Sequence, residues 1–81
     1  MTTKTYTILG DACELRVEVI PTMQALGDQP WEVLIYDLGD GLCLNCDSNH
    51  TFEAPSALQA ATEAVDCFLE HNGLPTSYSI N

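Results

Sequence analysis

The segment spanning residues 13–20 alternates between apolar and charged side chains, and this pattern constrains the fold more than any other feature of the sequence. The apolar positions are Cys13, Leu15, Val17 and Val19, and the charged positions between them are Glu14, Arg16 and Glu18. Successive side chains of a β-strand point to opposite faces, so the segment is predicted to be a strand with one buried and one solvated face. Pro21 ends it, because proline has no N–H for a sheet ladder. Such a strand needs partner strands and a layer that covers its apolar face.

Three more strands and one helix are expected along the chain. The further strands are predicted at residues 5–9, 31–38 and 42–47. The helix is expected to begin after Ser56, whose side chain caps the N-terminus while Gln59 completes a capping box. It ends at Gly73, because glycine is preferred in the left-handed position that follows a helix. Its predicted apolar face consists of Leu58, Ala61, Val65, Phe68 and Leu69.

These elements give the order β-β-β-β-α in one small domain that covers residues 1–81. Consecutive strands joined by short turns pair antiparallel, and a single helix covers one face of their sheet. The expected fold is therefore an α+β domain, a four-stranded antiparallel sheet with one C-terminal helix packed on one face. The tail, residues 76–81, either frays or adds a strand through Tyr78 and Ile80. The uncovered sheet face, with Leu34 and Tyr36, is a candidate dimer contact.

The balance of charges restricts what the protein binds. The chain has 12 acidic and 2 basic residues, and its net charge is −10. Such a surface repels nucleic acids and anionic membranes. The sequence also has no apolar run near the roughly 20 residues of a membrane span, and its first residues lack the apolar core of a secretory signal. We therefore expect a cytoplasmic protein that binds neither nucleic acid nor membrane, and whose partner is basic.

Four potential metal ligands have a spacing close to that of zinc ribbons and fingers. Cys43 and Cys46 form a C-x2-C pair, and Cys67 and His71 form a C-x3-H pair. However, Cys43 and Cys46 point to opposite faces of a regular strand, and the second pair lies away from the apolar face of the helix. A zinc-binding or redox module that uses these four residues stays open as an alternative to packing residues or incidental thiols. No catalytic constellation is evident, so we expect a protein that is not an enzyme and has no cofactor.

The acidic residues follow the predicted elements. Glu63, Asp66 and Glu70 lie within a narrow arc of the outer helix face, and the helix has no lysine or arginine to relieve their repulsion. The other candidate partner-binding residues lie on or beside the predicted strands and are Glu14, Glu18, Glu32 and Asp37. The simplest interpretation is an acidic surface that keeps the protein soluble. A more specific interpretation is that the carboxylates imitate phosphates and occupy a groove that normally binds DNA.

In size, acidic composition and sheet-plus-helix layout, the chain resembles phage-encoded anti-CRISPR proteins, particularly the DNA-mimic inhibitors of type I CRISPR systems. The seven acidic residues named above carry the resemblance, which covers the whole chain in outline. It implies a non-enzymatic inhibitor that binds a Cascade surveillance complex at its basic target-DNA channel or PAM-reading region, in the cytosol of the host cell. An acidic antitoxin or adaptor for another basic partner has the same electrostatics and stays open as an alternative.

Overall fold

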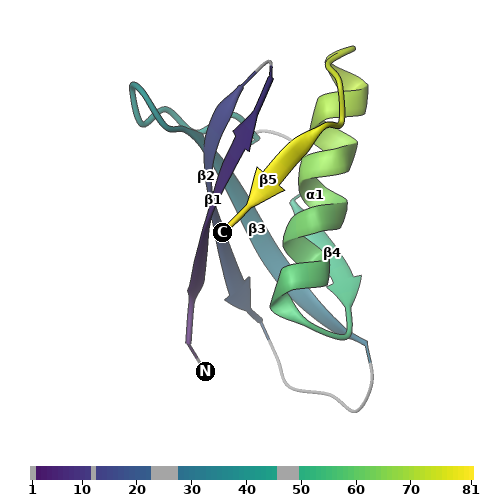
Figure 1. Cartoon of the computed structure of the whole chain (residues 1–81). Coiled ribbons are helices and arrows are strands. Elements are labelled where there is room, and N and C mark those ends of the chain that lie inside the picture. Colours follow the sequence, from purple (N-terminus) through teal and green to yellow (C-terminus); the bar gives the residue numbers. More distant parts are fainter. Residues whose placement is uncertain (1, 12, 23–27, 46–49) are drawn as a thin grey trace.

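The computed structural model describes the chain except for residues 1, 12, 23–27 and 46–49. The described residues form five strands and one helix (Figure 1), namely β1 Lys4–Gly10, β2 Glu14–Pro21, β3 Gln29–Asp37, β4 Thr51–Ala54, α1 Ala57–His71 and β5 Tyr78–Ile80. The strands pair antiparallel in the order β4-β3-β2-β1-β5. The α+β class and the antiparallel sheet are thus confirmed, with five strands in place of four. No helix among the described residues is long and apolar enough to cross a bilayer.

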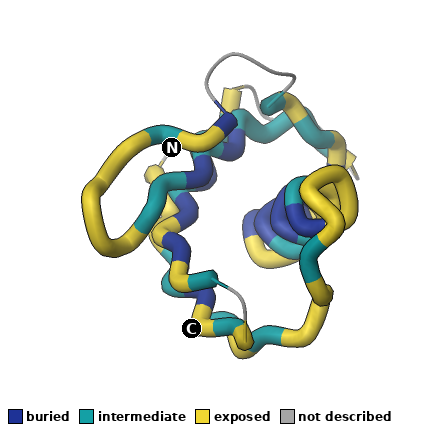
Figure 2. The backbone as a smooth tube through the Cα atoms, turned by 90° about the horizontal axis from the view of Figure 1, so that it is seen from above, coloured by how far each residue is buried: buried dark blue, intermediate teal, exposed yellow. Residues whose placement is uncertain are grey.

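The alternating segment forms the central strand, β2, and supplies the middle of the core. Val17 lies opposite Tyr6 of β1 and Ile35 of β3, so one apolar row crosses three strands. Seen from above, the strands form an arc around one side of α1, and the buried residues of the helix face into this arc (Figure 2). The opposite face of the sheet carries Arg16, and none of the described residues form a helix over it.

Small side chains form the surface with which α1 contacts the sheet. The buried residues of the helix are Ala57, Ala60, Ala61, Ala64, Val65 and Leu69. Alanines let the helix approach the curled sheet closely, so the buried arc is centred on them. Leu58, which the prediction placed on the apolar face, is instead 49% exposed. That part of the prediction is wrong, because it relied on large apolar residues where the fold uses small ones.

Both ends of the helix form as predicted. The Ser56 hydroxyl accepts a hydrogen bond from the N–H of Gln59 at 3.2 Å. Gly73 has a φ of 68°, in the left-handed region that favours glycine. The N–H of Leu74 donates to the carbonyl of Leu69 at 2.8 Å, which is a bond of the Schellman motif. This ending turns the chain back toward the sheet, where the tail pairs with β1 as β5.

The strand predicted at residues 42–47 is wrong in its described part. Cys43 pairs with Tyr36 as an isolated bridge, and Leu42 is 64% exposed. Cys46 and Asp47 lie outside the described residues. The strand next to β3 is β4, which comes later in the sequence and has only four residues. A segment that short shows too little alternation to be recognised.

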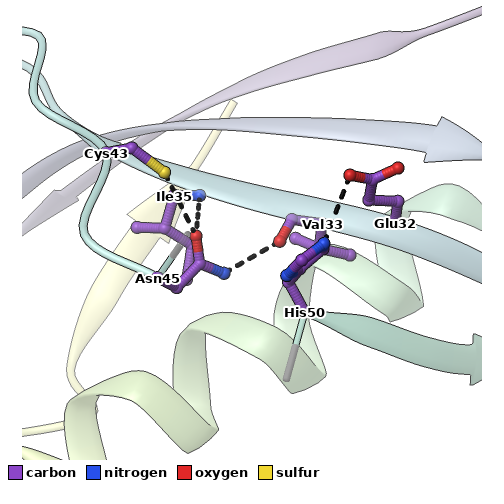
Figure 3. Close-up of polar contacts among 6 residues, drawn as sticks. All are labelled: Glu32, Val33, Ile35, Cys43, Asn45 and His50. Carbon is purple, nitrogen blue, oxygen red and sulfur yellow. Dashed lines mark hydrogen bonds and ion pairs between the residues drawn. The ribbon is translucent and has the colours of Figure 1, made fainter. Parts of the chain in front are cut away.

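The side chain of Asn45 takes the place of a strand along the edge of β3 (Figure 3). Its Oδ1 accepts the N–H of Ile35 at 2.9 Å, and its Nδ2 donates to the carbonyl of Val33 at 2.8 Å. On either side the backbone continues the pairing, because Leu44 N–H donates to the Ile35 carbonyl and Val33 N–H donates to the His50 carbonyl, both at 2.7 Å. The edge of β3 between the hairpin and β4 is therefore hydrogen-bonded, although the described residues beside it, 42–45 and 50, form no regular strand.

Candidate binding surface

Two glutamates form a stripe along the solvent-facing side of α1. Glu63 and Glu70 are both exposed. They are seven residues apart, which is about two turns and 10 Å along the helix axis. The chain has two strongly basic residues, Lys4 and Arg16, and they belong to β1 and β2. Glu63 and Glu70, called the acidic stripe below, thus lie on a helix without lysine or arginine.

Asp66 lies between these glutamates on the helix, but its carboxylate has a structural partner. The Tyr78 hydroxyl donates a hydrogen bond of 2.7 Å to Asp66 Oδ1, which ties β5 to the helix. Burial, and then the hydrogen bond to Asp66 and its negative charge, raise the pKa of Tyr78 well above its usual range. Asp66 therefore lies on the helix between the two glutamates, but it is only partly exposed and its carboxylate binds β5.

Replacing Tyr78 with phenylalanine is expected to lower the free energy of unfolding by about 1–2 kcal/mol at pH 7, because the hydrogen bond to a charged acceptor is lost. A tyrosine whose pKa is raised in the folded state stabilises the fold below its unfolded pKa, near 10, and that contribution is lost as the pH rises further. The difference between wild type and Tyr78→Phe should therefore shrink above about pH 10. Urea unfolding at several pH values measures this difference in the free energy of unfolding, and Tyr6→Phe is the control. An equal effect of both substitutions would contradict the role of the Asp66 bond.

Four of the predicted acids lie on strands of the sheet, Glu14 and Glu18 on β2 and Glu32 and Asp37 on β3. Two of them, Glu18 and Glu32, lie close to a basic side chain. Glu18 Oε2 lies 3.9 Å from Nε of Arg16, whose guanidinium is 4.8 Å from the centre of the Tyr36 ring. Glu32 Oε1 lies 3.3 Å from Nε2 of His50 (Figure 3), an ion pair only when the histidine is protonated. Both sites are partly solvated, so these pairs add little stability. The negative charge on the sheet face opposite α1 is therefore partly neutralised.

The last predicted acid, Asp37, supports the turn after β3. Its Oδ1 accepts the N–H of Gly39 at 2.7 Å and that of Asp40 at 3.1 Å. This arrangement is an Asx-type turn and explains why aspartate suits the position. The seven predicted residues thus do not form one surface. They divide between the outer face of α1, the opposite face of the sheet and the hairpin turn.

A cavity of 390 Å³ lies between α1 and the β3 side of the sheet. Most of the surface that lines it is apolar. The described residues that line it are Ile35, Leu44, Asn45, Phe52, Ala64, Cys67, Phe68, His71 and Asn72. No pattern in the sequence indicates this cavity, because a cavity depends on where two elements diverge. The signal that came nearest to it was the pairing of Cys67 with His71, which do lie at the same place.

The described residues do not bring together the four ligands of the zinc-binding alternative, which are Cys43, Cys46, Cys67 and His71. No group of three or more His, Cys, Asp or Glu among the described residues could hold a metal ion. Cys43 is disulfide-bonded and so does not offer a thiolate, while Cys46 lies outside the described part of the chain. The Cys43 sulfur is 3.7 Å from Asn45 Oδ1, but a disulfide sulfur has no proton to donate, so this is a contact and not a hydrogen bond.

The free thiols offer little support for redox chemistry. Cys13 and Cys67 are both free. Burial, and then the charge of Asp37, raise the pKa of the Cys13 thiol. A raised pKa lowers the fraction of reactive thiolate, so Cys13 is a poor nucleophile.

Comparisons of the chain with known protein families, with curated proteins and with solved structures find no match.

Proposed function

We propose that this protein is a non-enzymatic inhibitor that binds a basic, nucleic-acid-binding surface by presenting carboxylates in place of DNA phosphates. The observation that carries the proposal is the acidic stripe, in which Glu63 and Glu70 are exposed on a helix without lysine or arginine. Like charges that are neighbours on a helix destabilise it slightly, and an ordinary solvated helix face intersperses lysine or arginine, which relieves the repulsion. A cationic partner would relieve the repulsion on binding.

The partner we propose is a subunit of a type I CRISPR Cascade complex, in the cytosol of the host cell. Proteins that bind DNA present lysine and arginine to the phosphates, and release of counterions favours the complex. A helix bound in such a channel competes with DNA for these cations and presents no bases to read. The resemblance to DNA-mimic anti-CRISPR proteins supports this choice among basic partners. An antitoxin or adaptor that neutralises a basic toxin or enzyme would use the same acidic stripe, so the identity of the partner separates the two functions.

Affinity capture with the tagged chain from an extract of its native host tests the proposal. We expect mass spectrometry to identify a basic nucleic-acid-binding complex that is retained in about 0.1 M salt and released in about 1 M salt, because the Debye length falls from about 10 Å to 3 Å. Added duplex DNA should also displace it. A captured partner with no nucleic-acid-binding surface, or one that is retained equally at both salt concentrations, would contradict the DNA-mimic proposal.

A further inference from the structure

The acidic stripe and the cavity are connected through Cys67. Cys67 is exposed and also lines the cavity, so we take it to mark the mouth of the cavity. On α1, Cys67 is four residues from Glu63 and three residues from Glu70. Residues at these spacings are neighbours on a helix surface, with Cβ atoms about 5–6 Å apart. A partner that contacts both glutamates therefore also covers the mouth of the cavity.

The interior of the cavity suits an aromatic side chain. Its floor includes Ile35 and Ala64, which are 1% and 2% exposed. Phe52 and Phe68 line the cavity and are only partly buried, although both pack against the core. A volume of 390 Å³ is well above the roughly 150 Å³ of an apolar cavity that takes up benzene. The chain's own described residues leave part of this apolar surface uncovered.

We propose that the cavity binds an aromatic side chain of the basic partner, and that lysines or arginines on either side of this anchor pair with Glu63 and Glu70. The inference rests on the proposed function and adds the chemistry that the partner must carry. An aromatic anchor in a pocket with a ring of polar contacts is the usual form of an interface hot spot. A second copy of the chain does not fit, because its net charge of −10 would face the acidic stripe.

Three short synthetic peptides test this inference against the full chain. The first has one central tryptophan flanked by lysines, the second replaces the tryptophan with serine, and the third replaces the lysines with glutamine. Each peptide is titrated by calorimetry into wild type and two variants. Cys67→Trp fills the mouth of the cavity with a large side chain at an exposed position, and Cys67→Ser is the matched control. We expect wild type and Cys67→Ser to bind the first peptide about tenfold or more tightly than the second. Cys67→Trp should bind these two peptides equally.

The other outcomes separate the two proposals. If wild type binds both lysine peptides equally and with strong salt dependence, the cavity inference is overturned and the acidic surface stands. If it binds neither lysine peptide, the proposed function fails, and the inference fails with it. If the glutamine peptide binds as tightly as the first, the cavity accepts apolar groups without charge, which overturns the basic partner proposed for it.

Discussion

Replacing Asn45 with alanine is expected to lower the free energy of unfolding by about 2–4 kcal/mol. The substitution removes both partners that the amide provides to β3, the acceptor for the Ile35 N–H and the donor to the Val33 carbonyl (Figure 3). Each buried backbone group left unpaired costs roughly 1–3 kcal/mol. Asn45 is 7% exposed, so water does not readily replace the lost bonds. A domain of this size has a total stability of roughly 4–12 kcal/mol, so the loss is a large fraction of it.

Thermal unfolding measures the effect, with an expected decrease in melting temperature of roughly 10–25 °C. Asn45→Asp is the sharper variant, because it keeps an acceptor for Ile35 N–H but directs a carboxylate at the Val33 carbonyl. Protonation of that aspartate restores a donor, so its folded-state pKa should be raised and its stability should recover toward wild type as the pH falls through that value. If Asn45→Ala unfolds within about 0.5 kcal/mol of wild type, the amide does not replace a strand in solution.

The part of the fold that the sequence predicts depends on repeated local patterns. The segment of residues 13–20, most of which forms β2, shows four apolar positions in strict alternation, and α1 has a capping residue at one end and a left-handed glycine at the other. Each signal is repeated or reinforced within a few residues, so it predicts the element before any tertiary contact is known. The class of the fold follows, because several short strands and one helix leave few ways to cover a sheet.

The segment after the hairpin lacks such a signal. Leu42 and Leu44 alternate as they would in a strand, yet both are exposed, at 64% and 40%. The pairing along β3 there is completed by the Asn45 side chain, and a single amide in a ladder has no periodicity. The bond between Asp66 and Tyr78 has no signal in the sequence either. The helical spacing predicts that Asp66 lies on the outer helix face, but Tyr78 lies in a tail for which the sequence allows two conformations.

Reversing the charge of the acidic stripe is expected to weaken capture of the basic partner by about 100-fold or more. Close charge pairs at an interface contribute roughly 1.5 kcal/mol or more each, and about 1.4 kcal/mol corresponds to a factor of ten. The variant is Glu63→Lys/Glu70→Lys. It leaves Asp66 intact, so the hydrogen bond from Tyr78 to the helix is retained. A lysine at position 70 also suits the negative C-terminal end of the helix dipole, so the fold should be at least as stable as wild type.

The matched control is Glu14→Lys/Glu53→Lys, which changes the net charge equally at two exposed positions on β2 and β4. Binding is measured at low salt after thermal unfolding shows that both variants are folded. If both variants bind equally weakly, overall charge rather than the acidic stripe attracts the partner. If the strand variant loses binding while the helix variant keeps it, the interface lies on the sheet, where Arg16 already relieves part of the negative charge. Loss of binding in the helix variant alone would place the partner on α1, beside the mouth of the cavity. The acids of the helix and those of the sheet belong to different surfaces of the fold, so the two variants test different binding sites.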